Sequence, residues 1–179
     1  MLKSQNKSIG IFGGSFDPPH IGHVKITKIA LKKLKLKKIY WLVTKKNPFK
    51  KKTFFSIQKR VLEAKKATKK LKNVKVVYID DKIGSSRMIK AIYYFLKVKK
   101  EANLYLILGS DNLITFHKWT SWKKIAKLAK IAVFSRKGYD IKSNKSIVVK
   151  YLKKSNITYI KNKHFNISSS SIRKKLKSK

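Results

Sequence analysis

Three observations predict an α/β fold in which helices cover both faces of a doubly wound parallel sheet. Short runs rich in Ile, Val, Phe, Tyr and Trp alternate with longer, lysine-rich amphipathic runs along the 179 residues. The short runs contain few polar residues, which is typical of strands buried on both faces. No repeat or low-complexity linker interrupts the alternation, and the chain is too short for two ordinary domains. We therefore expect residues 1–179 to form a single domain.

Strands and helices are expected to alternate, joined by right-handed crossovers. Each strand is a run of β-branched and aromatic residues, and each helix is a longer run with apolar residues at helical spacing. In the first helix, for example, Val24, Ile26, Ile29 and Leu34 roughly follow one face. The expected elements, in chain order, are strand Ser8–Gly13, helix Gly22–Leu34, strand Lys38–Thr44, helix Ser56–Leu71, strand Val74–Ile79, helix Arg87–Lys97, strand Asn103–Leu108, helix Thr120–Leu128, strand Ile131–Ser135, helix Lys145–Lys154, strand Thr158–Ile160 and helix Ser169–Leu176.

The composition excludes several classes of protein. Cysteine is absent, which rules out disulfide scaffolds and thiolate metal sites. The longest apolar runs, LYLIL and IAVF, have the length of strands and are too short to cross a bilayer. The N-terminal MLKSQNKSIGIF lacks the apolar segment and cleavage site of a signal peptide. We therefore expect a cytoplasmic protein with no membrane partner.

The formal net charge of +40 raises the question of nucleic-acid binding. All but four of the 47 basic residues are lysine, and lysine occurs in every segment. Sites that recognise phosphates commonly use arginine, whose guanidinium donates two parallel hydrogen bonds. The pattern therefore favours compositional drift over a binding surface, and no specific nucleic-acid partner is expected. A lysine-rich nucleic-acid-binding protein is the alternative of a different class.

The stretch GGSFDPPHIGH, residues 13–23, follows the first expected strand and has the features of an anion-binding loop. Its two glycines let the backbone turn sharply and approach a ligand, and Asp17 can accept hydrogen bonds within the loop. The two prolines stiffen the chain before His20. His20 and His23 lie at the start of a helix, where free N–H groups favour an anion and the imidazole N–H groups suit phosphate oxygens.

Other interpretations of this stretch fit less well. A zinc site needs three or four protein ligands, and no nearby Cys, Glu or third His completes a set. A structural turn does not need both histidines. The stretch also lacks the Gly-Lys-Ser/Thr ending of a P-loop. Phosphate chemistry is the function that the pattern predicts.

The stretch resembles the nucleotidyltransferase superfamily, whose signature is a glycine-rich loop followed by His-x-Gly-His. It looks closest to the nicotinate mononucleotide adenylyltransferases of bacterial NAD synthesis. Four further segments match motifs of that family in the same order: WLVTKKNPFK at 41–50, LGSDNLITFHKW at 108–119, FSRKGY at 134–139 and ISSSSIRKKL at 167–176. The resemblance covers nearly the whole chain and implies a Rossmann-like sheet of the nucleotidyltransferase type.

The resemblance implies transfer of AMP from ATP to a mononucleotide phosphate, with release of pyrophosphate. It assigns catalytic roles to His20 and His23 at the ATP phosphates and to Arg173 at the triphosphate. The implied ATP-binding residues are Gly13, Gly14, Ser15, Phe16, His20, Gly22, His23, Gly109, Asp111, Arg136, Ile167, Ser168, Ser169, Ser170 and Arg173. Among these, Asp111 follows a strand and suits the adenosine ribose hydroxyls.

The acceptor implied by the resemblance is nicotinate mononucleotide, which gives deamido-NAD. The implied acceptor-binding residues are Ser15, Thr44, Lys50, Arg87, Met88 and Trp119. The segment IGSSRMIKAI departs from the family, because Arg87 and Met88 stand where it usually has Tyr and Thr. Arg87 can itself favour a carboxylate acceptor.

Magnesium is implied by ATP, and we expect the ion to be held mainly by the phosphates and water, with no protein ligands. The rival enzyme is pantetheine-phosphate adenylyltransferase of coenzyme A synthesis, which has similar flanking motifs. The double proline before His20, the Asn47-Pro48 loop and the SDNLITFHKW segment argue against it. The sequence leaves open whether the chain forms homo-oligomers.

Overall fold

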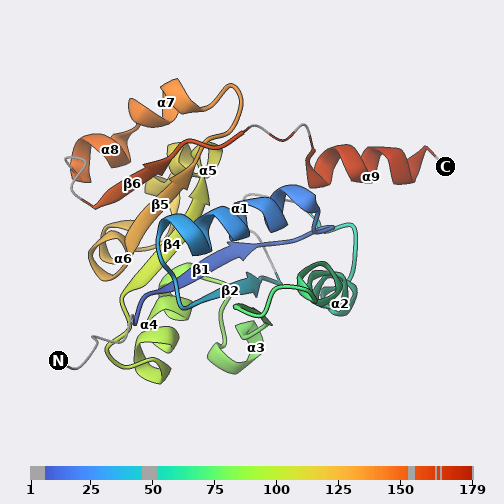
Figure 1. The fold of residues 1–179 in the computed structure, drawn as a ribbon, viewed down its shortest axis with the longest axis horizontal. Coiled ribbons are helices and arrows are strands. Elements are labelled where there is room, and N and C mark those ends of the chain that lie inside the picture. Colours follow the sequence, from blue (N-terminus) through green and yellow to red (C-terminus); the bar gives the residue numbers. More distant parts are fainter. Residues whose placement is uncertain (1–6, 46–51, 153–155, 164, 166, 179) are drawn as a thin grey trace.

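A computed structural model describes residues 7–45, 52–152, 156–163, 165 and 167–178. In this part of the chain a six-stranded sheet has the order β3-β2-β1-β4-β5-β6, and every neighbouring pair is parallel (Figure 1). The strands are β1 (Ile9–Gly14), β2 (Lys38–Val43), β3 (Val74–Val77), β4 (Leu104–Gly109), β5 (Lys130–Phe134) and β6 (Ile157–Ile160). The predicted α/β fold with a Rossmann-like parallel sheet is confirmed.

The helices connect these strands, and several are short. They are α1 (Ile21–Lys33), α2 (Ile57–Thr68), α3 (Asp80–Ile83), α4 (Met88–Val98), α5 (Ser110–Thr115), the 3-10 helix η1 (Phe116–Lys118), α6 (Trp122–Leu128), α7 (Asp140–Asn144), α8 (Ile147–Leu152) and α9 (Ser169–Lys177). Within the described ranges, none of these helices combines the length and apolarity that a bilayer span requires.

Apolar side chains pack on both faces of the sheet. On one face, strand residues such as Ile11 and Leu106 pack against Ile92 of α4 and Ile125 of α6. On the other face, a second cluster that includes Trp41 contains residues of α1 and α2. Because successive side chains of a strand point to opposite faces, runs without polar residues can fill both clusters. The sheet is therefore doubly wound, as the apolar strand sequences predict.

The short helices α3, α5, η1 and α7 are the main difference from the predicted elements. They contain three to six residues, so they complete less than two turns, and a run this short carries no readable helical period. Two longer helices also begin later than predicted. Helix α6 starts at Trp122, and α8 starts at Ile147 and is described to Leu152.

The two central strands create the crevice where a ligand can bind. The chain leaves β1 toward β2 on one side and leaves β4 toward β5 on the other, so the order of the strands reverses between β1 and β4. The loops that follow these two strands diverge, and they leave an opening at the carboxyl ends. Helix α9 lies beyond this end of the sheet (Figure 1).

Candidate functional site

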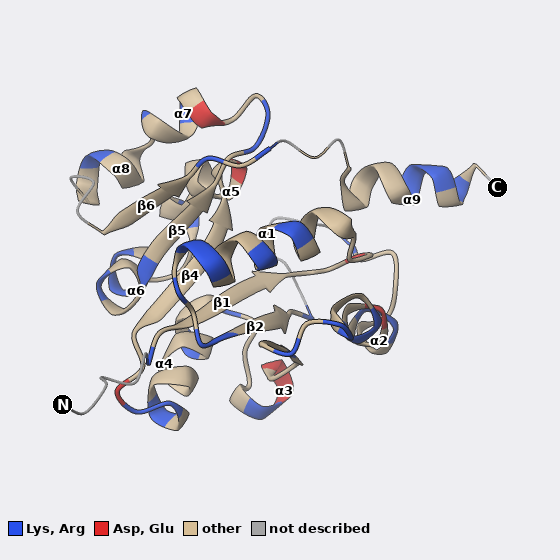
Figure 2. Ribbon diagram, in the orientation of Figure 1, with Lys and Arg blue, Asp and Glu red and all other residues tan. Residues whose placement is uncertain are grey.

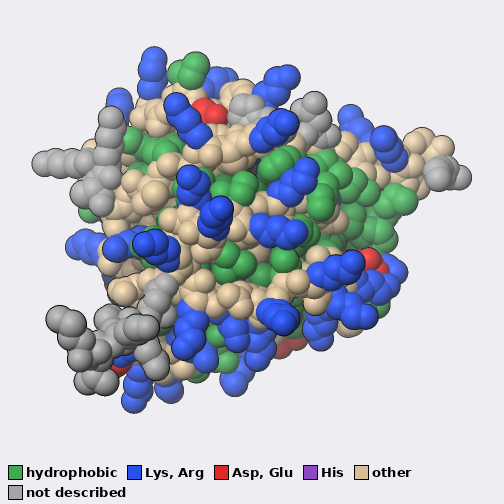
Figure 3. Space-filling view, viewed as in Figure 1, with side chains coloured by type: hydrophobic (Ala, Val, Ile, Leu, Met, Phe, Trp, Pro, Cys, Tyr) green, Lys and Arg blue, Asp and Glu red, His purple; other side chains and the backbone are tan. Residues whose placement is uncertain are grey.

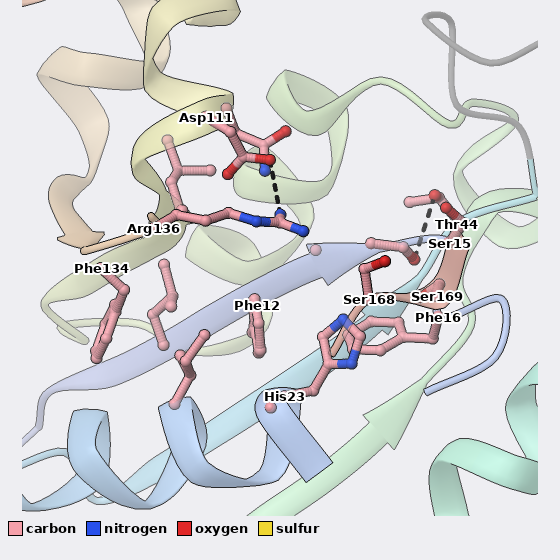
Figure 4. A pocket seen from close by; sticks show the side chains of 18 of the residues that line it. Phe12, Ser15, Phe16, His23, Thr44, Asp111, Phe134, Arg136, Ser168 and Ser169 are labelled. Atoms are coloured by element: carbon pink, nitrogen blue, oxygen red, sulfur yellow. Dashed lines mark hydrogen bonds and ion pairs between the residues drawn. The ribbon is translucent and has the colours of Figure 1, made fainter. Parts of the chain in front are cut away.

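A cavity of about 1060 Å³ opens at the carboxyl ends of β1 and β4, and Figure 4 shows part of its lining. Its walls come from the β1–α1 loop, the end of β2, the α3–α4 loop, the ends of β4 and β5, and the start of α9. The lining residues are Phe12, Gly13, Gly14, Ser15, Phe16, His20, Gly22, His23, Ile26, Thr44, Ser85, Ser86, Arg87, Met88, Ile107, Leu108, Gly109, Asp111, Asn112, Lys118, Trp119, Thr120, Phe134, Ser135, Arg136, Lys137, Asn162, Phe165, Ile167, Ser168, Ser169, Ser170 and Ser171.

The two predicted histidines lie together at the start of α1. The centroids of the His20 and His23 rings are 3.8 Å apart. The backbone N–H of His20 donates to Nδ1 of His23 over 3.1 Å. A neutral imidazole that accepts at Nδ1 carries its proton on Nε2. The helix cap therefore orients the His23 ring, with Nδ1 toward the backbone and Nε2 on the other side of the ring.

Aromatic packing holds the His23 ring in place. Phe16 stacks on Trp41 with ring centroids 4.7 Å apart, and the His23 ring lies 5.0 Å from the Phe16 ring. The indole N–H of Trp41 donates to Thr27 Oγ1, which in turn donates to the backbone carbonyl of His23. Strand β2 thus anchors the first turns of α1 through a buried side chain, so the imidazole has a defined position at the edge of the cavity.

Burial, together with a smaller effect of the nearby Arg136 guanidinium, lowers the pKa of His20 to about 4. Unfolding returns the imidazole to its ordinary pKa of 6.5. As the pH falls, His20 is therefore protonated in the unfolded chain at a higher pH than in the folded chain. The contribution of His20 to stability is therefore present above pH 6.5 and is lost as the pH falls toward 4. At neutral pH both the folded and the unfolded chain hold a mostly neutral His20.

We expect the His20 Cε1–H resonance of the ligand-free protein to titrate with a midpoint near pH 4, because burial and Arg136 disfavour the imidazolium. A proton NMR titration from pH 7 to 3.5 measures this midpoint. Arg136→Gln removes the second cause and should raise the midpoint. A His20 midpoint near 6.5 in the native protein would contradict the environment described here.

The opposite wall of the cavity carries an ion pair. Arg136 Nη1 lies 2.7 Å from Asp111 Oδ2, and the backbone N–H of Arg136 donates to Ser110 Oγ over 3.0 Å. The other carboxylate oxygen, Asp111 Oδ1, is buried and accepts no hydrogen bond from the described residues. A side chain at Gly109 would overlap this oxygen and force the Asp111 carboxylate to shift. Asp111 thus offers the cavity an acceptor suited to a hydroxyl group.

The N-terminus of α9 closes the cavity near the histidines. Ser168 Oγ accepts from the N–H of Ser171, and Ser171 Oγ accepts from the N–H of Ser168, which forms a capping box. Ser169 Oγ donates to the carbonyl of Pro18 over 2.8 Å. Because α9 has no buried residue among those described, polar contacts of this kind set its position. Ile167 and the four serines that follow it all line the cavity, at the end of the helix that favours anions.

Arg173 is not among the residues that line the cavity, although its partner Ser170 is. Its Nη1 donates to the backbone carbonyl of Asp17 over 2.6 Å and lies 3.8 Å from the Asp17 carboxylate. Its Nη2 donates to Ser170 Oγ. The guanidinium therefore donates its hydrogen bonds to oxygens of the protein, and Arg173 connects α9 to the β1–α1 loop.

Most of the predicted acceptor-binding residues lie on one side of the cavity. Thr44 directly follows β2, Arg87 is the N-cap of α4, and Met88 is the first residue of that helix. Trp119 lies after η1, and its buried indole N–H donates no hydrogen bond to the described residues. The predicted residue Lys50 falls outside the described residues, as does the Asn47-Pro48 loop.

Buried charged side chains behind the cavity wall were not predicted. Asp17 is 4% exposed and accepts hydrogen bonds from the N–H groups of Phe54 and Phe55. Arg60 is 1% exposed and Asp80 is 5% exposed. Arg60 is one of only four arginines in a lysine-rich chain, and that rarity is a signal that could have identified it.

Cavity residues outside the motifs, such as Asn162 and Phe165, were also missed. They belong to segments with no recognisable pattern. The described residues also contain no group of three or more His, Asp or Glu side chains that could hold a metal ion.

A parallel sheet with this strand order, and a cavity of mixed polar and apolar lining at its switch point, define a ligand-binding α/β protein of the Rossmann-like class. The chain belongs to the cytidylyltransferase-like family, whose model matches residues 11–175. It is 44% identical over 173 residues to a "probable nicotinate-nucleotide adenylyltransferase" of Pelagibacter ubique, covering 97% of this chain and 96% of the relative. A protein of Rhizobium johnstonii with the same description is 34% identical over 131 residues, 73% of this chain and 65% of that protein. The predicted family resemblance is confirmed.

Solved structures share the fold at low sequence identity. A Plasmodium falciparum nicotinic acid mononucleotide adenylyltransferase complexed with APC has a TM-score of 0.75 and 17% identity, covering 94% of this chain and 83% of that one. The same enzyme complexed with NaAD has a TM-score of 0.72 and 20% identity, with the same coverage. At this level of identity the likeness shows the fold.

Proposed function

We propose that this protein is a nicotinate-nucleotide adenylyltransferase, which transfers AMP from ATP to nicotinate mononucleotide. A phosphate oxygen of the mononucleotide attacks the α-phosphorus, the bond between the α-phosphorus and its bridging oxygen breaks, and pyrophosphate leaves. The observation that carries the proposal is one cavity that is lined by His20, His23 and the serine-rich N-terminus of α9. In it, His23 lies near Ser168 and Ser169, and Asp111 lies on the opposite wall (Figure 4). The relatives with this description support the same substrates.

Catalysis of this kind depends on positioning and on stabilising charge, since the protein forms no covalent bond. His23 donates from Nε2 to the oxygen on which charge develops as pyrophosphate leaves, and His20 donates to a neighbouring phosphate oxygen. The free N–H groups at the start of α9 bind further phosphate oxygens, since the positive end of the helix dipole favours anions. Arg173 supports these contacts by holding Ser170 and the β1–α1 loop together.

Each end of the cavity suits one substrate. Asp111 Oδ1 accepts from a ribose hydroxyl of ATP, and Arg136 fixes the orientation of that carboxylate. On the other side, Ser15, Thr44 and Arg87 line the part of the cavity that we assign to the mononucleotide, and Trp119 offers an aromatic face to its pyridine ring. We propose that Mg²⁺ enters with ATP as part of the substrate, since the described residues offer no ligand cluster.

An assay of pyrophosphate release tests the function directly. The protein is incubated with ATP, Mg²⁺ and one of three acceptors: nicotinate mononucleotide, nicotinamide mononucleotide or phosphopantetheine. We expect turnover with nicotinate mononucleotide and formation of deamido-NAD. Exclusive use of phosphopantetheine would replace the proposal with the rival enzyme, and no release with any acceptor would reject an adenylyltransferase of this group.

Arg87 is the residue that we expect to select the acid form of the acceptor. Its guanidinium lines the cavity and forms no ion pair with the described residues, whereas Arg136 is paired with Asp111. An unpaired guanidinium can bind a pyridine carboxylate with two parallel hydrogen bonds, and a neutral carboxamide cannot accept both.

We expect Arg87→Gln to lower kcat/KM for nicotinate mononucleotide by about tenfold or more, the size of one charge-assisted hydrogen bond. The value for nicotinamide mononucleotide should change little. The measurement is kcat/KM for both acceptors at saturating ATP. Lys90→Gln, three residues after Arg87 in the first turn of α4 and outside the cavity lining, serves as the control. An equal loss for both acceptors would contradict the role in selection.

Nucleic acid is not among the partners that we propose. Lys and Arg occur on helices around the whole fold, including α1, α2, α4, α6, α8 and α9 (Figure 2). On the face shown in Figure 3, basic side chains are scattered among polar and apolar ones and form no continuous stripe. Such a surface predicts weak binding to DNA that disappears steeply as salt is added.

A further inference from the structure

We propose that Arg60 is a positioning residue for the reaction: its buried guanidinium orients the Ser15–Phe16 peptide so that the Phe16 N–H faces the cavity as a donor for phosphate. The inference rests on the proposed function. Arg60 lies on α2, does not line the cavity and belongs to none of the motifs that identify the family. At 1% exposure it is among the largest fully buried side chains of the described residues.

The guanidinium binds backbone carbonyls from three separate segments. Its Nη1 donates to Ser15 over 2.7 Å and to Thr44 over 2.8 Å. Its Nη2 donates to Lys45 over 3.3 Å, and its Nε donates to Phe55 over 3.2 Å. The β1–α1 loop, the end of β2 and the segment before α2 are therefore tied to one planar group.

These contacts determine which way a peptide of the loop points. A trans peptide directs its C=O and N–H to opposite sides. Because the Ser15 carbonyl points to Arg60 behind the wall, the N–H of Phe16 points the other way, toward the cavity that Ser15 and Phe16 both line. That N–H donates to no described residue. It is therefore available to an anionic ligand.

The backbone of Phe16 needs such support. Its φ is 45°, in the left-handed region that residues with a side chain rarely adopt. A conformation of this kind persists only when its surroundings hold it. Arg60 holds the carbonyl that precedes Phe16, and the stacking of Phe16 on Trp41 holds its ring.

Two buried carboxylates keep the cation in place and extend the network. Burial lowers the pKa of Arg60, while Asp17 and Asp80 oppose that shift by favouring the charged form. Asp80 accepts from the backbone N–H of Lys45 over 2.7 Å and from the hydroxyl of Ser86 over 2.5 Å. Through Asp80, the same network reaches the α3–α4 loop, whose residue Ser86 lines the cavity.

Replacement of Arg60 by lysine tests this role, because lysine stands at nearly all of the other basic positions of the chain. Arg60→Lys keeps the charge and loses the planar fork, so one ammonium cannot reach carbonyls on three segments. We expect kcat/KM for nicotinate mononucleotide to fall by about 10²-fold, the cost of a small misplacement of reacting groups. Ala64→Gly, buried one turn along the same face of α2, is the control: it lowers the melting temperature without touching the loop.

A second measurement reads the Phe16 N–H without relying on turnover. In ¹H–¹⁵N spectra of the full-length protein, pyrophosphate should shift the Phe16 amide of the wild type and of Ala64→Gly. The shift should be lost in Arg60→Lys. If the wild type bound pyrophosphate with no change at Phe16, the proposal would be overturned even if Arg60→Lys did not fold.

The kinetic measurements also test whether Arg60 positions the loop. Near-normal kcat/KM in a folded Arg60→Lys variant, or an equal loss in Ala64→Gly, would overturn the positioning role. A wild type that transfers no AMP would reject the proposed function instead, and the Phe16 response would still report on Arg60.

Discussion

Replacement of His23 by alanine is expected to lower kcat by about 10²–10³-fold, the effect of removing one side-chain donor to a developing oxyanion. The KM for ATP should change much less, because the interaction strengthens only as pyrophosphate leaves. The fold should persist, since the apolar residues of α1 and their packing against the sheet do not depend on the His23 side chain. Steady-state kinetics and a thermal melt of the purified variant measure the two effects.

His117→Ala is the matched control for this prediction. His117 is a partly buried histidine that does not line the cavity, so its removal should leave kcat within about twofold. His23→Gln offers a further comparison, because its amide N–H₂ can replace the imidazole donor in part. Turnover of His23→Ala equal to that of the control would remove His23 from the mechanism.

Asp17→Asn is expected to destabilise the protein by about 3 kcal/mol, because it neutralises a buried carboxylate that accepts several hydrogen bonds. The Asp17 carboxylate accepts from the N–H groups of Phe54 and Phe55, and Arg173 lies beside it. An asparagine can accept through one oxygen only, and its N–H₂ group then faces a donor. For a chain of this length the melting temperature should fall by about 6–12 °C.

Glu63→Gln is the control variant, because it also removes one carboxylate but from an exposed position. Glu63 lies on the surface of α2 beside Lys59 and Lys66, and such exposed pairs contribute about 1 kcal/mol at most. Calorimetry or urea unfolding of both variants gives the comparison. Equal melting temperatures for Asp17→Asn and the wild type would show that the buried acid does not hold the loop.

The local pattern of the chain was enough to predict the sheet and the position of the site on it. Strands such as β2 and β4 are apolar throughout because both of their faces are covered, so they can be recognised without knowing their partners. The histidine motif could be predicted for a similar reason. His20 and His23 are three residues apart at the start of one helix, so their proximity follows from local geometry.

Contacts between distant segments could not be predicted in this way. The sequence suggested that Asp17 bonds within its own loop and that Arg173 meets the histidines in the cavity. In the structure Asp17 binds the segment before α2, and Arg173 binds Asp17 from 156 residues away. Arg60 belongs to no motif recognised in the sequence. Its guanidinium nevertheless donates to the carbonyl of Ser15, 45 residues earlier in the chain.

The difference has one physical cause. Hydrophobic burial is nondirectional and leaves a periodic trace in the sequence, so composition and spacing are sufficient to predict which faces of an element are covered. A hydrogen bond of a buried charge depends on distances of a few ångströms between atoms, and these exist only once the strands and loops have packed. The apolar strands and the His-x-Gly-His loop can therefore be predicted from the order of the residues alone. The partners of Asp17, Arg60 and Arg173 are set by the packing of the whole chain.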